Sequence, residues 1–152
     1  MKLVKDSTRS FALHVAGYQF PELENEDYDS NWLNIRIDVL HPEGSWTATD
    51  PSLLTYELRE LGTWLASITK NPAESSEIDF IEPNLKFQYR AESDPQILRI
   101  LFELESRPGW APSDGAGMED LWVDIPFARE DFESAAAAIA EECRRFPQRT
   151  KV

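Results

Sequence analysis

Residues 31–44 read NWLNIRIDVLHPEG and carry the clearest structural signal in the chain. Apolar side chains alternate there with polar ones, at Leu33, Ile35, Ile37 and Val39. A period of two is typical of a β-strand with one buried and one solvated face. The following tetrapeptide, residues 41–44, has proline second and glycine fourth, as a type I turn prefers. We therefore expect residues 44–49, GSWTAT, to return as a short antiparallel partner strand.

Similar strand patterns occur on both sides of this hairpin. Upstream, Phe11, Leu13 and Val15 alternate with polar or small residues within residues 10–20. Downstream, residues 76–90 predict two strands around the turn Glu82-Pro83-Asn84, and residues 96–105 and 121–127 predict one strand each. These segments add to the same predicted sheet.

Residues 49–71 predict a helix between the two groups of strands. Asp50 is suited to cap its first turn, and Pro51 suits the first helical position because proline has no N–H to leave unpaired. One apolar stripe follows at steps of three and four residues, formed by Leu54, Leu58, Leu61, Leu65 and Ile68. Pro72 follows the end of this pattern, as a stop signal does.

Residues 129–146 predict a second helix. Its first turn is acidic and its last turn is basic, which complements the helix dipole. The element order lacks strict alternation of strands and helices. We therefore predict one α+β domain over residues 1–152, with a largely antiparallel sheet of six to seven strands and two helices packed on one face.

The chain is strongly acidic. Its 152 residues include 28 acids against 15 Lys and Arg, which gives a formal charge of −13. Such a charge disfavours nucleic acid and anionic membranes as partners, and it is compatible with a basic partner, a metal cation or a role in solubility alone. Cys143 is the single cysteine, and no apolar run has the pattern of a signal peptide or the length of a membrane span. These features predict a cytoplasmic protein.

Groups that could perform catalysis are scarce. The GxSxG, HExxH, Walker and GxGxxG motifs do not occur in the sequence. His14 and His41 read as solvated or half-buried side chains, and Cys143 lies on the apolar stripe of the second helix. We predict no catalytic residue, no cofactor and no metal site. An enzyme of unrecognised chemistry remains an alternative that would need a deep pocket lined by His14 or by desolvated carboxylates.

Residues 27–31, Asp-Tyr-Asp-Ser-Asn, match the first half of a calcium-binding loop. The match then fails, because Trp32 stands where the loop needs glycine and Asp38 stands where it needs a bidentate glutamate. A calcium-dependent or general binding domain is therefore a second alternative, against a turn in which Asp29 or Asn31 caps its own backbone.

Four motifs together resemble the WapI-type immunity proteins. They are Tyr18-Gln19-Phe20-Pro21, Asp29-Ser30-Asn31-Trp32-Leu33, the helical pattern from Leu54 to Leu65 with Glu57 and Trp64, and Glu82-Pro83-Asn84-Leu85-Lys86-Phe87. The resemblance runs from about Phe11 to Phe146. It implies a small cytoplasmic bacterial protein that binds and neutralises the toxic C-terminal domain of a contact-dependent polymorphic toxin, often one that cleaves RNA.

Two surfaces could contact such a toxin domain. The stretch 21–29, PELENEDYD, has five acids and no base, and Trp110 lies between two prolines as an interface anchor or a cover for the end of the sheet. The solvated sheet face has mixed charges that suit a lattice of cross-strand ion pairs, at Arg36, Asp38, Lys86, Arg90, Arg99 and Glu103. We therefore predict partner contacts at Glu22, Glu24, Glu26, Asp27, Asp29 and Trp110.

Overall fold

The computed structural model describes residues 1–111 and 120–150 of the chain. Its strands are β1 (Lys2–Asp6), β2 (Arg9–Tyr18), β3 (Trp32–His41), β4 (Gly44–Leu54), β5 (Ser76–Ile78), β6 (Leu85–Arg90), β7 (Ile97–Phe102) and β8 (Leu121–Pro126). The helices are α1 (Thr55–Lys70) and α2 (Arg129–Arg145), and short 3-10 helices span Asp29–Asn31 and Leu104–Ser106. Residues 112–117 of the loop that follows Trp110 lie outside the described part.

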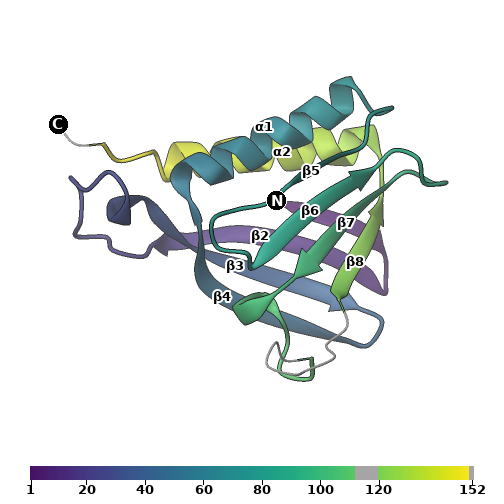
Figure 1. Ribbon diagram of the computed structural model, residues 1–152, viewed down its shortest axis with the longest axis horizontal. Helices are drawn as coiled ribbons and strands as arrows, with labels where there is room; N and C mark the ends of the chain where they lie inside the picture. The colour runs from purple at the N-terminus through teal and green to yellow at the C-terminus, as the bar shows by residue number, and fades with distance from the viewer. Residues whose placement is uncertain (112–119, 151–152) are drawn as a thin grey trace.

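The strands form two four-stranded antiparallel sheets, with the orders β1-β2-β3-β4 and β5-β6-β7-β8 (Figure 1). The α+β class is confirmed. The prediction of one sheet with six to seven strands is wrong, because there are eight strands in two sheets within the described residues. Alternation shows which side of a strand is buried, but it does not say which strands pair. Strand β1 was missed because only Leu3 is buried within it.

The β3–β4 hairpin is longer than predicted. Strand β4 continues through Leu54, and its residues Asp50 and Pro51 pair with Ile35 and Asn34 of β3. The predicted helix start at these residues is therefore wrong. Strand β4 lies at an edge of its sheet, where a proline without an N–H is tolerated.

Helix α1 instead begins at Thr55 and is capped by its own Glu57. The carboxylate of Glu57 accepts hydrogen bonds from the Leu54 N–H at 2.9 Å and the Ile81 N–H at 2.8 Å. The side chain is buried, and this burial raises the pKa of Glu57. The helix ends before Asn71 and Pro72, as the sequence predicts.

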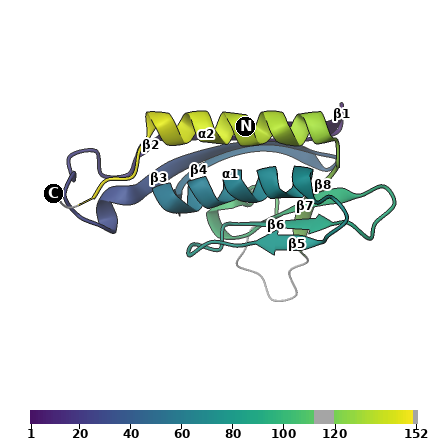
Figure 2. The same ribbon diagram turned by 90° about the horizontal axis from the view of Figure 1, so that it is seen from above.

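The core lies between the two sheets and under the helices. Phe11 of β2 contacts Phe87 of β6 edge-on, with ring centroids 5.8 Å apart, and Phe102 of β7 at 6.0 Å. The two helices lie side by side on one side of the molecule (Figures 1 and 2). They approach closely where Gly62 faces Ile139, since a Cβ on Gly62 would lie 2.8 Å from that side chain.

Candidate functional site

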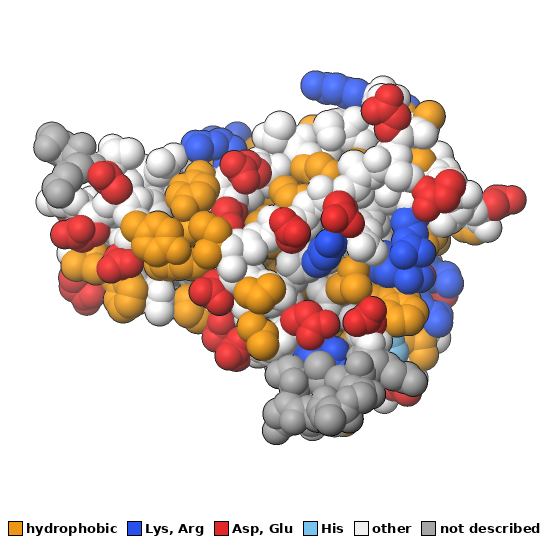
Figure 3. Space-filling model, viewed as in Figure 1, with side chains coloured by type: hydrophobic (Ala, Val, Ile, Leu, Met, Phe, Trp, Pro, Cys, Tyr) orange, Lys and Arg blue, Asp and Glu red, His pale blue; other side chains and the backbone are white. Residues whose placement is uncertain are grey.

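The predicted contact region is the connection between β2 and β3. We call residues 20–29 the acidic segment; every residue in it is exposed. Three large apolar side chains stand among its acids, with exposed fractions of 40% for Phe20, 38% for Leu23 and 48% for Tyr28. Figure 3 shows hydrophobic and acidic side chains side by side at the left end of the molecule, where Figure 1 places this connection. The surface therefore combines apolar area with negative charge.

The base of the acidic segment is fixed by one buried amide. The Asn31 side-chain N–H groups donate to the backbone oxygens of Asp27 at 2.9 Å and Arg149 at 2.7 Å. Its Oδ1 accepts from the Thr55 hydroxyl and the Arg149 N–H, both at 2.8 Å. Because the amide oxygen already accepts two hydrogen bonds inside the protein, Asn31 is used to hold the loop and not as an outward-facing calcium ligand.

Arg149 holds the upstream part of the segment. Its guanidinium Nη1 donates to the carbonyl oxygens of Phe20 at 3.2 Å, Pro21 at 3.3 Å and Leu23 at 2.7 Å. The same guanidinium lies over the ring of Tyr18, 3.5 Å from the centroid. The acidic segment is thus bound through its backbone, and its carboxylates are not used for this attachment.

Four carboxylates of the segment form no ion pair within the part of the chain that the structure describes. Among the described residues, no ion pair within 4.0 Å involves Glu22, Glu24, Glu26 or Asp29. Four negative charges on a short exposed loop create a local negative potential that adds to the charge of the whole chain. This arrangement attracts a basic surface.

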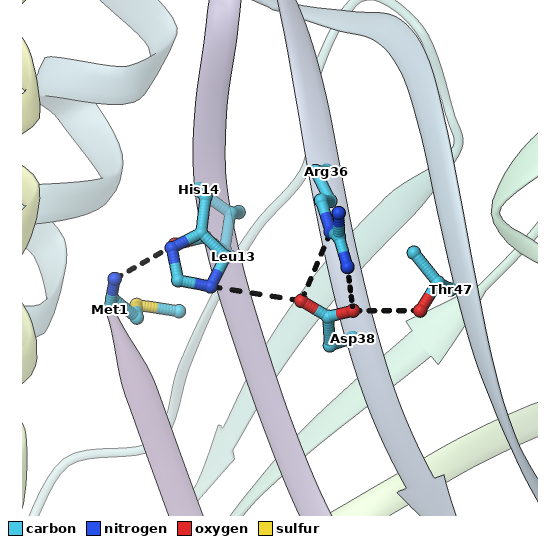
Figure 4. A network of polar contacts seen from close by, with 6 residues as sticks. All are labelled: Met1, Leu13, His14, Arg36, Asp38 and Thr47. Atoms are coloured by element: carbon cyan, nitrogen blue, oxygen red, sulfur yellow. Dashed lines mark hydrogen bonds and ion pairs between the residues drawn. The ribbon is translucent and has the colours of Figure 1, made fainter.

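The outer face of the first sheet has a different electrostatic character (Figure 4). Asp38 accepts hydrogen bonds from Arg36 at 3.0 Å and from the Thr47 hydroxyl at 2.7 Å, and its carboxylate lies 3.7 Å from the His14 imidazole. The hydrogen bond from Arg36, followed by that from Thr47, holds the pKa of Asp38 below its ordinary value. The charge of Asp38 is therefore compensated within the sheet.

The second sheet carries two cross-strand ion pairs. Lys86 of β6 contacts Glu77 of β5 at 2.9 Å, and Arg99 of β7 binds both carboxylate oxygens of Asp124 of β8 at 2.8 and 2.9 Å. The predicted lattice of charges thus exists for these residues, but it is divided between two sheets. Glu103 instead faces Arg107 at 3.9 Å.

Trp110 lies far from the acidic segment. Its ring packs edge-on against Trp46 at 5.7 Å and beside His41 at 5.9 Å, next to the β3–β4 turn. The acidic segment adjoins the other end of β3. At 3.3 Å per residue, the strand places the two ends about 30 Å apart. Trp110 also approaches Gly44, where φ is 154° and a Cβ would lie 3.2 Å from the indole nitrogen. Trp110 therefore packs on the end of the sheet and still leaves 46% of its surface exposed.

The two histidines and the cysteine lie on different elements, His14 on β2, His41 on β3 and Cys143 on α2. The side chain of His14 is 53% exposed and borders a shallow depression of about 660 Å³ on the first sheet. That of His41 is 14% exposed beside Trp46, and Cys143 packs against the core, where burial raises its pKa. In the part of the chain that the structure describes, no three His, Cys, Asp or Glu side chains could hold a metal ion together.

The sequence analysis named the acids of the segment, but it did not predict the exposed apolar surface of Phe20, Leu23 and Tyr28 or the contacts of Arg149. The apolar residues were visible as interruptions of the acidic run, whereas the role of Arg149 depends on a contact across 126 positions. Within residues 1–111 and 120–150, neither helix has the length and apolar character needed to cross a membrane.

Comparison with known proteins gives one family. The model of the immunity protein WapI-like family matches residues 2–147. No curated protein matches the chain. The family match therefore extends over both sheets and both helices.

Proposed function

The chain belongs to the WapI-like immunity protein family, and on that premise we propose that it binds and neutralises a basic toxin domain without catalysing a reaction. The toxin domain would be the C-terminal part of a polymorphic toxin, and a ribonuclease is the activity that we propose for it. The observation that supports this proposal is the acidic segment, in which Glu22, Glu24, Glu26 and Asp29 form no ion pair among the described residues and lie beside exposed apolar side chains.

Charge complementarity gives this surface a physical role. A ribonuclease needs cationic groups to hold the phosphates of its substrate. An inhibitor that presents carboxylates is steered toward those cations and can cover them. The net charge of −13 strengthens this attraction at long range, and the acidic segment directs it to one place.

Apolar side chains in the same segment supply the short-range contacts. Interfaces typically have an apolar centre with aromatic anchors and a polar rim. Tyr28, Leu23 and Phe20 fit the central role, and Glu22 and Glu24 fit the rim. We assign the anchor role to these residues because Trp110 lies at the opposite end of β3.

The outer faces of the sheets are less suited to this contact. Asp38, Glu77 and Asp124 already have basic partners within the chain. A basic partner would have to displace Arg36, Lys86 or Arg99 before it could use those carboxylates, and the displaced cation would lose its own partner. Glu22, Glu24, Glu26 and Asp29 require no such exchange among the described residues.

The experiment is a titration of toxin activity with the purified chain. The toxin domain encoded beside this chain's gene is mixed with increasing amounts of the protein, and RNA cleavage is followed. We expect full inhibition at one chain per toxin domain, with affinity that falls as salt rises.

Two outcomes would contradict the proposal. Failure to form a complex at low salt would remove the binding function. Inactivation of many toxin molecules by one chain would show turnover and so a catalytic mechanism.

A further inference from the structure

The C-terminal tail, residues 146–150, runs beside the acidic segment. Figures 1 and 2 both place the C-terminus next to the β2–β3 connection. Tyr18, at the end of β2, anchors the tail by donating its hydroxyl hydrogen bond to the Pro147 carbonyl at 2.6 Å and by packing edge-on against Phe146. Gln148 also accepts a hydrogen bond from Arg59 of α1 at 3.1 Å. The tail is therefore tied to the body of the protein on both sides of Pro147.

Arg149 connects this anchored tail to the acidic segment. Its backbone N–H and C=O form a reciprocal pair of hydrogen bonds with the buried Asn31 amide, and its guanidinium binds three carbonyl oxygens of the loop, those of Phe20, Pro21 and Leu23. A free loop of this length and composition would sample many conformations. The contacts of Arg149 select one of them.

The chemistry of these contacts preserves the negative surface. The guanidinium binds carbonyl oxygens and the Tyr18 ring, while none of the described ion pairs joins Arg149 to a carboxylate. One nitrogen, Nη1, makes all three carbonyl contacts, while the planar guanidinium lies over the Tyr18 ring. Lysine lacks the planar group that stacks on an aromatic ring.

We propose that Arg149 is a positioning residue for the docking surface: its side chain fixes the backbone of the acidic segment from Phe20 to Leu23, so that Leu23 and the neighbouring carboxylates are presented in their binding arrangement. The part of this inference that concerns binding to a toxin domain rests on the proposed function. The ordering of the acidic segment by Arg149 is a property of the free protein. Arg149 lies beyond residue 147, where the family match ends. The proposal therefore concerns a feature of this chain outside the matched range.

The first experiment measures order in the free protein. Glutamyl endopeptidase cleaves after exposed glutamates, and Glu22, Glu24 and Glu26 lie within the segment. We expect Arg149→Ala and Arg149→Lys to increase cleavage at these sites on the order of tenfold and to speed amide hydrogen exchange across residues 20–31. Cleavage and exchange at the wild-type rate in both variants would overturn the proposal.

A matched control distinguishes the loss of the Arg149 contacts from the loss of one positive charge. Arg144→Ala removes the same charge from an exposed side chain whose ion-pair partner is Glu141 of α2 and not a residue of the acidic segment. We expect its cleavage pattern to equal that of the wild type. Among the described residues, the Arg149 side chain contacts exposed loop carbonyls and the Tyr18 ring, and the backbone bonds of Arg149 to Asn31 persist in Arg149→Ala. Thermal unfolding of this variant should therefore stay close to that of the wild type; a large loss would show a general structural role and contradict the proposal.

The second experiment measures binding to the toxin domain encoded beside this chain's gene. We expect Arg149→Ala to bind on the order of tenfold more weakly, because the segment must then be ordered during binding. Unchanged affinity with a loosened segment would refute the positioning role, and tighter binding would show that the tail obstructs the surface. If the wild type does not bind either, the proposed function fails, whereas the proteolysis result still decides whether Arg149 orders the segment.

Discussion

The acidic residues of the sheets and those of the acidic segment differ in whether a basic side chain lies next to them. Asp38, Glu77 and Asp124 each lie within 3.0 Å of an arginine or lysine of the same sheet. The carboxylates of Glu22 and Glu24 have no such neighbour among the described residues, although their backbone is held by the C-terminal tail. The comparison shows that charge is compensated where it holds strands together and left available where a partner could use it.

The largest expected effect tests this difference in charge. The triple variant Glu22→Gln, Glu24→Gln, Glu26→Gln should lower the association rate constant with the toxin domain about 100-fold at low salt, because it removes the local attraction. Stopped-flow fluorescence at several salt concentrations measures the rate.

The matched control removes three acids from the sheets instead, as Asp38→Asn, Glu77→Gln, Asp124→Asn. It changes the net charge by the same amount but leaves the acidic segment intact. We expect a much smaller loss of rate. Equal losses in the two triple variants would mean that only the total charge matters and would remove the distinction between the two regions.

The next effect concerns the apolar part of the segment. Tyr28→Ala removes a side chain that is 48% exposed, so it should cost about 2 kcal/mol of binding free energy, or about 30-fold in affinity, mainly through faster dissociation. Ile81→Ala is the control, because Ile81 is 54% exposed but lies outside the segment. Calorimetric titration measures both; equal losses would argue against a local anchor.

The sheet side of the comparison should show the reverse behaviour. Asp124→Asn leaves Arg99 without its bidentate partner, although Arg99 still lies over the Trp122 ring at 4.4 Å. We expect the free energy of unfolding to fall by about 1 kcal/mol, with unchanged affinity for the toxin domain. Urea denaturation measures the first quantity. A loss of affinity without a loss of stability would place the contact surface on the second sheet.

The smallest expected effect is a pH dependence at Asp38. Arg36 lowers the pKa of Asp38 below 3.8 in the folded protein, so the folded state binds fewer protons than the unfolded state in that range. The ion pair therefore contributes stability above pH 3.8 and loses it as the pH falls through the lowered pKa. Asp38→Asn should remove this contribution, and its unfolding free energy should approach that of the wild type in acid. A difference in unfolding free energy between the two proteins that stays constant as the pH falls would contradict the lowered pKa of Asp38.

Periodicity predicted most of the elements because burial alone creates it. The alternation at Ile35 and Ile37 marks β3, and the leucine stripe through Leu58 and Leu61 marks α1. The start of α1 was wrong because Asp50 and Pro51, a good local cap, pair with β3 in the folded protein. The pairing of β4 with β3 therefore outweighed the local helix-capping preference of these two residues. The division into two sheets was hidden for the same reason, since pairing depends on residues distant in sequence.

The candidate site also has a part that the sequence predicts and a part that depends on tertiary contacts. The acids of the segment could be found from charge alone, because a run without bases must be solvated. Trp110 was grouped with them on residue type, yet β3 separates the two regions. The contribution of Arg149 could not be inferred, because its partners are backbone oxygens near the other end of the chain.

The most direct measurement is amide hydrogen exchange of the protein alone and bound to its toxin domain. We predict that protection on binding is concentrated in residues 20–31, with the exchange of β6, β7 and β8 unchanged. Protection over the second sheet, with residues 20–31 exchanging as in the free protein, would contradict the assignment of the docking surface.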